Sequence, residues 1–290
     1  GYVFRAENIT LFILKNFSRY SIIKKVMNMV YDISKIRAKE GFICDMDGVV
    51  YHGNELLPPA KKFVEWLERE NKKFLYLTNS SERSPLELRQ KLCRMGLDVD
   101  QSHFYTSALA TAEFIKNQHP GASVFCIGEA GLHNALYQAG ISMNDVNPDY
   151  VVVGETQNYS YQNISKAVRL VMNGAKLIGT NPDVTGPAEG GTIIPACRAM
   201  ISPIELATGR SAYFLGKPNP LMMRTGLKLL GCHSADAAII GDRMDTDIIA
   251  GIQSAVDTVL VLTGVSSVQT VDEFPYRPTY ILGSVGDILE

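Results

Sequence analysis

Two aspartates, Asp45 and Asp47, stand one residue apart, directly after the apolar run Gly41–Cys44 and directly before Gly48. In an extended chain both side chains point the same way, and Gly48 lets the backbone turn sharply after them. Two such charges about 4 Å apart repel by roughly 4 kcal/mol at an effective dielectric constant near 20. A hard divalent cation removes this repulsion, and Mg²⁺ also brings phosphate with it. The pair therefore predicts a magnesium site that handles phosphate.

Further carboxylates follow a second apolar run, at residues 237–241. Asp242 can supply another ligand to the same cation, and Asp245 and Asp247 come shortly after it. These two either complete the coordination through water or orient the ligands. Asp245 is better interpreted as a solvated or helix-starting carboxylate. For Asp247, orientation of the site and stabilisation of a helix N-terminus both stay open.

The same residues can support phosphoryl transfer. Asp45 can attack phosphorus to form an aspartyl-phosphate, which divides one difficult displacement into two easier ones. Asp47 can protonate the leaving oxygen and then take a proton from the hydrolytic water. The phosphoryl oxygens also need positive charge and hydrogen-bond donors. Lys217, in GKPNP, is the candidate cation, and Thr78 and Asn79 offer a hydroxyl and an amide.

These side chains need a scaffold that brings them together. From Gly41 onward, short apolar runs alternate with helical patterns, which predicts an α/β fold with a parallel sheet covered on both faces. In such sheets the ligand site lies beyond the carboxyl ends of the strands. The ends of four runs are CDMD, LTNSS, GKP and IGDRMDTD. We therefore expect the candidate residues to gather at one edge of the sheet.

The stretch between about Gly121 and Gly216 contains its own strands and helices. Because the runs on either side of it already make a sheet, this stretch predicts an inserted second domain. Within it, Asn181 and Asp183 can contact the base or ribose of a substrate. Formation of a turn around Pro182 explains both residues equally well.

Four segments of the chain, DMDGVVYHG, LTNSSERS, GKPNP and GDRMDTDI, resemble the ordered motifs of the haloacid dehalogenase (HAD) superfamily of phosphatases. The chain is more narrowly similar to the NagD-like nucleotide phosphatases, because FYTSALATAEFI, DVNPDYVVVGET and LVLTGVSS also resemble that branch. The similarity extends from about residue 41 to the end of the sequence.

This resemblance implies a three-layer, Rossmann-like parallel-sheet core with an inserted α/β cap domain. The core would comprise residues 41–120 and 216–290, and the cap residues 121–215. The cap would close over the site and select the substrate, commonly a nucleoside 5′-monophosphate such as UMP or GMP.

The resemblance also implies a role for each candidate residue. Asp45 would be the nucleophile and a Mg²⁺ ligand, Asp47 the acid/base and a ligand through its backbone carbonyl, and Asp242 the third protein ligand. Lys217 would neutralise the phosphate, and Asp247 would act from just outside the metal ligands. Thr78 and Asn79 would bind the phosphate. Apart from the resemblance, Gly48, Asn181 and Asp183 are the further candidates for substrate binding.

Three functions stay open. The first is a magnesium-dependent phosphatase that prefers nucleoside monophosphates. The second is a phosphatase for sugar phosphates or damaged metabolites, because the motifs contact only the phosphate end of a substrate. The third is a non-catalytic scaffold that keeps affinity for phosphate. Dehalogenation is disfavoured, since that chemistry needs no metal and would not require Asp47.

Composition limits the partners. The 290 residues carry a net charge of −2, so nothing global favours a nucleic-acid polymer or an anionic membrane. The five cysteines are scattered and lack a C-x-x-C spacing, which indicates reduced thiols in the cytoplasm. We expect a small phosphate monoester as the partner and leave a homo-oligomer open.

The first 40 residues differ from the rest. They carry a net charge of +5 against −7 for the remaining 250. A stripe with helical spacing predicts a basic amphipathic helix. We favour packing of this helix on its own domain or a second subunit over a location on a membrane surface. The stripe comprises Ile13, Phe17, Tyr20, Ile23, Met27 and Val30.

Overall fold

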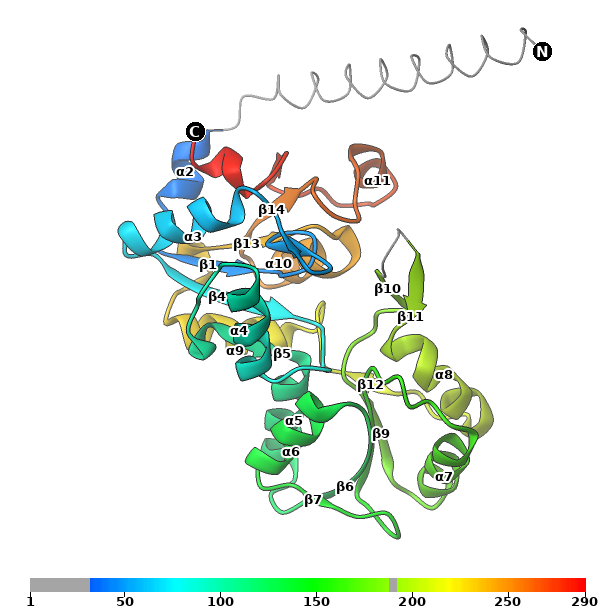
Figure 1. Ribbon diagram of the computed structural model, residues 1–290. Helices are drawn as coiled ribbons and strands as arrows, with labels where there is room; N and C mark the ends of the chain where they lie inside the picture. The colour runs from blue at the N-terminus through cyan, green and yellow to red at the C-terminus, as the bar shows by residue number, and fades with distance from the viewer. Residues whose placement is uncertain (1–31, 188–191) are drawn as a thin grey trace, which may run out of the picture.

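The computed structural model describes residues 32–187 and 192–290, which form two parallel sheets with helices around them (Figure 1). The larger sheet has the strand order β15-β14-β13-β1-β4-β5. Its strands are β1 (Gly41–Cys44), β4 (Lys73–Thr78), β5 (Phe104–Thr106), β13 (Ala237–Gly241), β14 (Asp257–Val261) and β15 (Tyr280–Leu282).

Both faces of the larger sheet are covered, so its central strands are continuous apolar runs. In β1, Ile43 lies opposite Ile239 and Leu75. Alternate side chains enter two different apolar clusters, with Phe42 in one and Ile43 in the other. Helices thus form a layer on each side, which confirms the predicted three-layer α/β architecture. They include α3 (Ala60–Arg69), α4 (Pro85–Arg94), α5 (Ser107–Gln118), α9 (Pro220–Leu230), α10 (Ile249–Gln253) and α11 (Val268–Asp272).

The smaller sheet is built from residues between the two parts of the larger one. Its order is β12-β9-β8-β6-β7, with helix α7 (Tyr161–Met172) and helix α8 (Cys197–Thr208) on one face and helix α6 (Ala130–Gln138) on the other. Its strands are β6 (Ser123–Ile127), β7 (Ser142–Met143), β8 (Tyr150–Val153), β9 (Lys176–Gly179) and β12 (Tyr213–Phe214).

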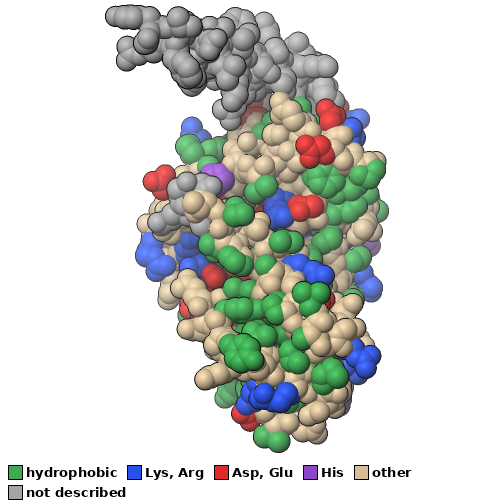
Figure 2. Space-filling model, turned by 90° about the vertical axis from the view of Figure 1, so that its right-hand side faces the viewer, with side chains coloured by type: hydrophobic (Ala, Val, Ile, Leu, Met, Phe, Trp, Pro, Cys, Tyr) green, Lys and Arg blue, Asp and Glu red, His purple; other side chains and the backbone are tan. Residues whose placement is uncertain are grey.

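Helix α5 lies between the two sheets. One apolar cluster contains Ile43 of the larger sheet, Ala108 and Ile115 of α5, and Val152 of the smaller sheet. The molecule is elongated along the line that joins the two sheets (Figure 2). Acidic and basic side chains are interspersed on the face that this figure shows. Because this cluster is continuous, the two sheets share part of one apolar core.

Two hairpins and several short helical turns complete the described chain. Strands β2 (Tyr51–His52) and β3 (Glu55–Leu56) form a hairpin just after β1, and β10 (Thr185–Pro187) pairs with β11 (Ile193–Pro195) beside α8. The short helices are α2 (Ile33–Arg37), η1 (Gln101–His103), η3 (Ser234–Asp236), η4 (Met244–Ile248) and η5 (Val285–Ile288).

One sequence expectation about strand ends needs correction. The run before GKP was expected to end at the edge of the main sheet, but β12 pairs with β9 of the smaller sheet. Phe214 lies over Gly179, where an added Cβ would be 2.3 Å from a carbon of the Phe214 ring. This close contact fits β12 against the smaller sheet, so Lys217 reaches the site from that sheet.

The predicted amphipathic helix with its stripe from Ile13 to Val30 lies outside the described residues. Within residues 32–187 and 192–290, no helix is long and apolar enough to cross a membrane.

Candidate active site

Lys217 and three aspartates meet beyond the carboxyl ends of β1 and β13. The Lys217 Nζ lies 2.7 Å from Asp45 Oδ1 and 2.7 Å from Asp247 Oδ1. The lysine side chain is 2% exposed and that of Asp247 fully buried, whereas Asp45 keeps 15% of its side chain accessible. Asp45 is thus the member of the group that a ligand can still reach.

Burial and neighbouring charges change the pKa values of Lys217, Asp247 and Asp242. Burial alone would lower the pKa of Lys217, but Asp247 and Asp45 outweigh it and raise that pKa, so the ammonium stays charged. Burial, with Asp45 adding to it, raises the pKa of Asp247 to about 6 although Lys217 opposes the change. Burial raises the pKa of Asp242 well above its usual range, and Asp247 and Asp45 add to that effect.

The donor set suits a hard divalent cation. Ligand oxygens of Asp45, Asp242 and Asp247 lie within 4.8 Å of one another. Glycines shape the space around Asp242, because a Cβ at Gly48 would lie 2.5 Å from Asp242 Oδ2 and one at Gly264 only 1.9 Å away. Carboxylates without a cation repel at this separation, so the arrangement fits Mg²⁺.

The hydrogen bonds of Asp247 distinguish it from the other two aspartates. Its Oδ1 accepts from Lys217 Nζ, and its Oδ2 accepts from the backbone N of Arg243 at 3.2 Å. Both oxygens therefore already have a protein donor, which suits a residue that orients its neighbours. Asp245 instead pairs with Arg243, with two of its contacts at 3.0 and 2.8 Å, and its side chain is 53% exposed.

Asp47 lies at the start of the turn that leads into β2. Its side chain lies 3.5 Å from His52 Nδ1 and is 40% exposed, apart from the cluster of three aspartates. Burial raises the pKa of Asp47 although the bond to His52 opposes it. A raised pKa keeps a proton available for donation to a leaving group. The contact with His52 was not predicted, because an isolated turn histidine gives no signal in the sequence.

The next strand end supplies Thr78 and Asn79, both buried. The Thr78 Oγ1 accepts a hydrogen bond from Ser80 N at 3.1 Å. The side chain of Asn79 holds the backbone of Lys217 on both sides, since Oδ1 accepts from Lys217 N at 2.7 Å and Nδ2 donates to Lys217 O at 3.0 Å. Asn79 Nδ2 also donates to Asp183 Oδ2 at 3.0 Å. This asparagine therefore links the carboxyl end of β4 to Lys217.

The two candidates from the inserted stretch occupy different surroundings. Asn181 is fully buried and donates through Nδ2 to Asn79 O at 2.8 Å and to Glu155 Oε1 at 2.5 Å. Asp183 keeps one buried oxygen, Oδ1, without a hydrogen bond among the described residues, 3.9 Å from Arg243 Nη1. Of the two side chains, Asp183 is the one that keeps an acceptor oxygen without a hydrogen-bond donor among the described residues.

Comparison with known proteins agrees with this geometry. A haloacid dehalogenase-like hydrolase model matches residues 42–142, and a second HAD-like hydrolase model matches residues 214–288. The chain is 42% identical to dihydroxyacetone phosphatase of Corynebacterium glutamicum (strain R) over 86% of this chain and 90% of that one. It is 40% identical to acid sugar phosphatase of Staphylococcus epidermidis over 83% of this chain and 93% of that one.

The third relative is ribonucleotide monophosphatase NagD of Escherichia coli, 41% identical over 85% of this chain and 96% of that one. The solved structure of E. coli NagD superimposes with a TM-score of 0.80 at 40% identity and covers 86% of this chain and 98% of NagD. All three relatives are named as phosphatases, and each is matched over most of its length. The chain therefore belongs to the haloacid dehalogenase-like hydrolases and is a NagD-like phosphatase, a phosphoric monoester hydrolase.

Proposed function

We propose that this chain is a Mg²⁺-dependent phosphatase that hydrolyses small phosphate monoesters through an aspartyl-phosphate on Asp45. The observation that supports this most directly is the contact of the buried Lys217 Nζ with both Asp45 and Asp247. This contact holds the partly accessible carboxylate of Asp45 beside a fixed positive charge. A carboxylate in that state can act as a nucleophile toward phosphorus.

The residues that would hold Mg²⁺ are Asp45, Asp242 and the backbone carbonyl of Asp47, with Asp247 orienting them. When bound, the ion supplies charge neutralisation for the phosphoryl oxygens and the carboxylates. Lys217 stabilises the same oxygens from the protein side, and Thr78 contributes a hydroxyl donor at the neighbouring strand end.

In the first chemical step a carboxylate oxygen of Asp45 forms a bond to phosphorus while the bond from phosphorus to the ester oxygen breaks. Asp47 gives its proton to that departing oxygen, so the product leaves as an alcohol. In the second step Asp47 takes a proton from a water molecule, whose oxygen attacks phosphorus. The bond between phosphorus and Asp45 then breaks, and phosphate is released with both aspartates restored.

For the substrate we propose a phosphate ester of a polyhydroxy compound, with nucleoside 5′-monophosphates first. The relation to ribonucleotide monophosphatase NagD supports this choice. Residues 121–215 would serve as the cap that selects the substrate, and the buried Asp183 Oδ1 could accept a hydrogen bond from a ribose hydroxyl. Sugar phosphates are the second candidate, because dihydroxyacetone phosphatase and acid sugar phosphatase are equally similar to this chain.

We also propose a cytoplasmic location, which the five free cysteines support. A homo-oligomer stays a prediction from the sequence.

A substrate panel tests the proposal. Wild-type protein is assayed with UMP, GMP, dihydroxyacetone phosphate and a hexose phosphate, with Mg²⁺ and with excess chelator. We expect turnover only with the metal and the highest kcat/KM for a nucleotide. Asp45→Asn should lose activity by about a thousandfold or more, because an amide is a poor nucleophile and the acyl-phosphate does not form. Undiminished hydrolysis by folded Asp45→Asn would refute the mechanism, and a preference for a sugar phosphate would select the second candidate.

A further inference from the structure

A largely buried carboxylate of the smaller sheet contacts the phosphate-binding edge. Glu155 follows β8, and its Oε2 accepts hydrogen bonds from Ser81 N at 3.1 Å and from Ser81 Oγ through a short contact. Its Oε1 accepts from Asn181 Nδ2 at 2.5 Å. A carboxylate enclosed in this way is stable only while its oxygens keep their donors. The mechanism above gives Glu155 no chemical step.

The contacts of Glu155 continue to the catalytic lysine. Asn181 Nδ2 also donates to the backbone oxygen of Asn79 at 2.8 Å, and Ser107 Oγ donates to the same oxygen at 2.5 Å. The side chain of Asn79 in turn holds both backbone polar groups of Lys217. A continuous series of hydrogen bonds therefore connects Glu155 with Lys217.

Close packing leaves this series little room to rearrange. A Cβ at Gly154 would lie 2.6 Å from Ser81 Oγ. A Cβ at Gly216 would lie 2.7 Å from Asn181 Cβ and 2.7 Å from Asn79 Oδ1. Glycine at these two positions allows the strand ends of both sheets to approach closely. The loss of a hydrogen bond at Glu155 should therefore shift Asn181 and, through it, Asn79 and the backbone of Lys217.

We propose that Glu155 is a positioning residue, which fixes the phosphate-binding turn 78–81 and the backbone of Lys217 from the smaller sheet. This inference rests on the proposed function, because the segment it positions is the proposed phosphate site. Glu155 acts through Ser81, Asn181 and Asn79 and contacts no substrate.

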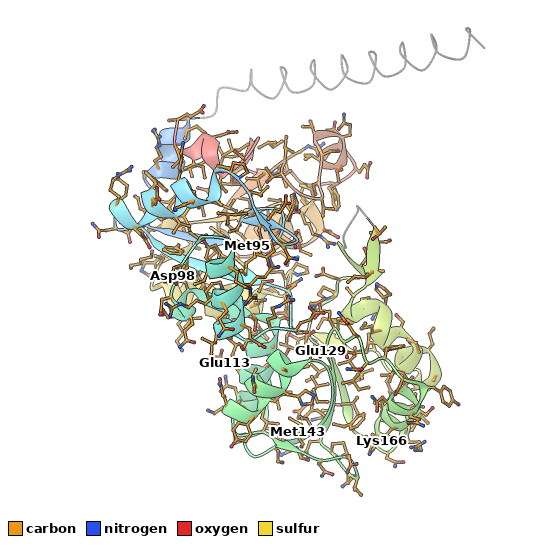
Figure 3. All side chains as sticks on the ribbon, in the orientation of Figure 1. Met95, Asp98, Glu113, Glu129, Met143 and Lys166 are labelled. Atoms are coloured by element: carbon orange, nitrogen blue, oxygen red, sulfur yellow. The ribbon has the colours of Figure 1, made fainter. Side chains whose placement is uncertain are left out.

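The test variant is Glu155→Gln, which keeps the size of the side chain but turns one acceptor oxygen into an NH2 donor. Either Ser81 or Asn181 then faces a donor and loses its bond. The matched control is Glu129→Gln, the same chemical change at a residue that follows β6 of the smaller sheet and precedes α6 (labelled in Figure 3). Glu129 Oε1 accepts from Thr156 Oγ1 at 2.7 Å and from Gln157 N at 3.0 Å, contacts that do not continue to Asn79.

Three measurements are made on each folded variant: kcat and KM with 4-nitrophenyl phosphate, the inhibition constant of inorganic phosphate, and hydrogen exchange of a peptide covering residues 78–83. For Glu155→Gln we expect kcat to fall and the inhibition constant to rise, each by about tenfold or more, with faster exchange at 78–83. Glu129→Gln should stay within about twofold of wild type on all three. Equal values for the two variants would overturn the inference, even if Glu155→Gln unfolds at a lower temperature.

Failure of the proposed function is recognised separately. If wild-type protein hydrolyses no phosphate ester, hydrogen exchange decides alone, and unchanged exchange in Glu155→Gln overturns the positioning role. If Glu155→Gln does not fold, Ser81→Ala removes the hydroxyl contact to Glu155 with a smaller change. We then expect a lower kcat and faster exchange at 78–83, and wild-type values would overturn the inference.

Discussion

At the residue scale, the negative charges in the site outnumber the positive ones. Three carboxylates, those of Asp45, Asp242 and Asp247, face one ammonium group, that of Lys217. When all are ionised, three negative charges and one positive charge leave two negative charges in a largely buried space. Burial raises the pKa of Asp242, and repulsion from Asp247 and Asp45 raises it further. A single divalent cation balances the two negative charges, which is a physical reason to expect Mg²⁺ here.

Gly264→Ala tests this account of the metal. The new Cβ would lie 1.9 Å from Asp242 Oδ2, so that carboxylate has to move. We expect the Mg²⁺ concentration for half-maximal activity to rise by about tenfold or more. The control is Gly186→Ala, whose Cβ would meet nothing closer than Ile194 Cγ1 at 3.8 Å. If both variants keep the wild-type dependence on Mg²⁺, Asp242 is not a ligand.

The sequence predicted that Asp45, Asp242, Asp247 and Lys217 gather at one edge of a parallel sheet. For the three aspartates the reason holds, because they follow β1 and β13 of the larger sheet. Lys217 instead follows β12 of the smaller sheet. The sequence did not indicate that Asn79 holds the backbone of Lys217 or that Glu155 contacts Ser81, because these hydrogen bonds join residues 138 and 74 positions apart, which no local pattern encodes.

At the element scale, the β2–β3 hairpin that follows Asp45 and Asp47 packs against helix α4. Lys91 of α4 lies with Nζ 3.8 Å from the centroid of the Tyr51 ring in β2. Tyr51 O also accepts a hydrogen bond from Gly48 N at 2.8 Å. The hairpin thus connects α4 with the turn that carries Asp47.

This contact predicts a dependence of stability on pH. Burial lowers the pKa of Lys91 from 10.5 to about 8, Arg83 adds to the effect, and Asp47 opposes it. Between these two values the unfolded chain binds more protons than the folded chain, so the free energy of unfolding rises with pH. The cost of burying the charged Lys91 in the folded chain is fully present below about pH 8 and is removed as the pH rises. When the pH is raised from about 7.5 to 9.5, the free energy of unfolding of the wild type should increase by on the order of 1 kcal/mol more than that of Lys91→Met. This value is reduced for the partial exposure of the lysine.

Urea unfolding at the two pH values measures this gain. Lys61→Met, at an exposed position of α3, is the control and should follow the wild-type curve. If the free energies of unfolding of wild type and Lys91→Met differ by the same amount at both pH values, the prediction is contradicted.

Long apolar runs predicted the central strands well, since β1, β4 and β13 match GFIC, FLYLT and AAIIG. The short edge strands β5 and β15 have three residues each, too few for a recognisable period in the sequence. The partner of β12 depends on the contact between Phe214 and Gly179, which becomes visible only in three dimensions.

At the scale of the whole molecule, residues just before the first strand belong to the core. Ile36 of α2 is fully buried, and Arg37 Nε donates to Ile288 O at 2.7 Å. Glu40 N donates to Asp236 O at 2.8 Å. The beginning of the described chain thus packs near its end, as Figure 1 shows. The resemblance to relatives begins at about residue 41 and did not reveal this packing.

Two truncated chains test the packing. Removal of residues 1–31 leaves all of these contacts in place, so this shorter chain is the reference. Removal of residues 1–40 also removes Ile36 and should lower the free energy of unfolding by about 2–5 kcal/mol relative to that reference, the usual cost of losing a buried aliphatic side chain. Denaturant unfolding compares the two truncated chains. Equal stability of the two truncated chains would contradict the packing of α2.

The placement of β12 has a mechanical consequence. Leu215 N and Gly216 N still donate to Gly179 O and Thr180 O, at 3.2 and 2.7 Å, and the next residue is Lys217. The ammonium group beside Asp45 is therefore attached, without an intervening linker, to the sheet of the inserted stretch. Asn79, just after β4 of the larger sheet, holds the backbone of the same lysine. Lys217 therefore fastens the two sheets to each other, and they can move apart only if one of these two sets of hydrogen bonds is given up.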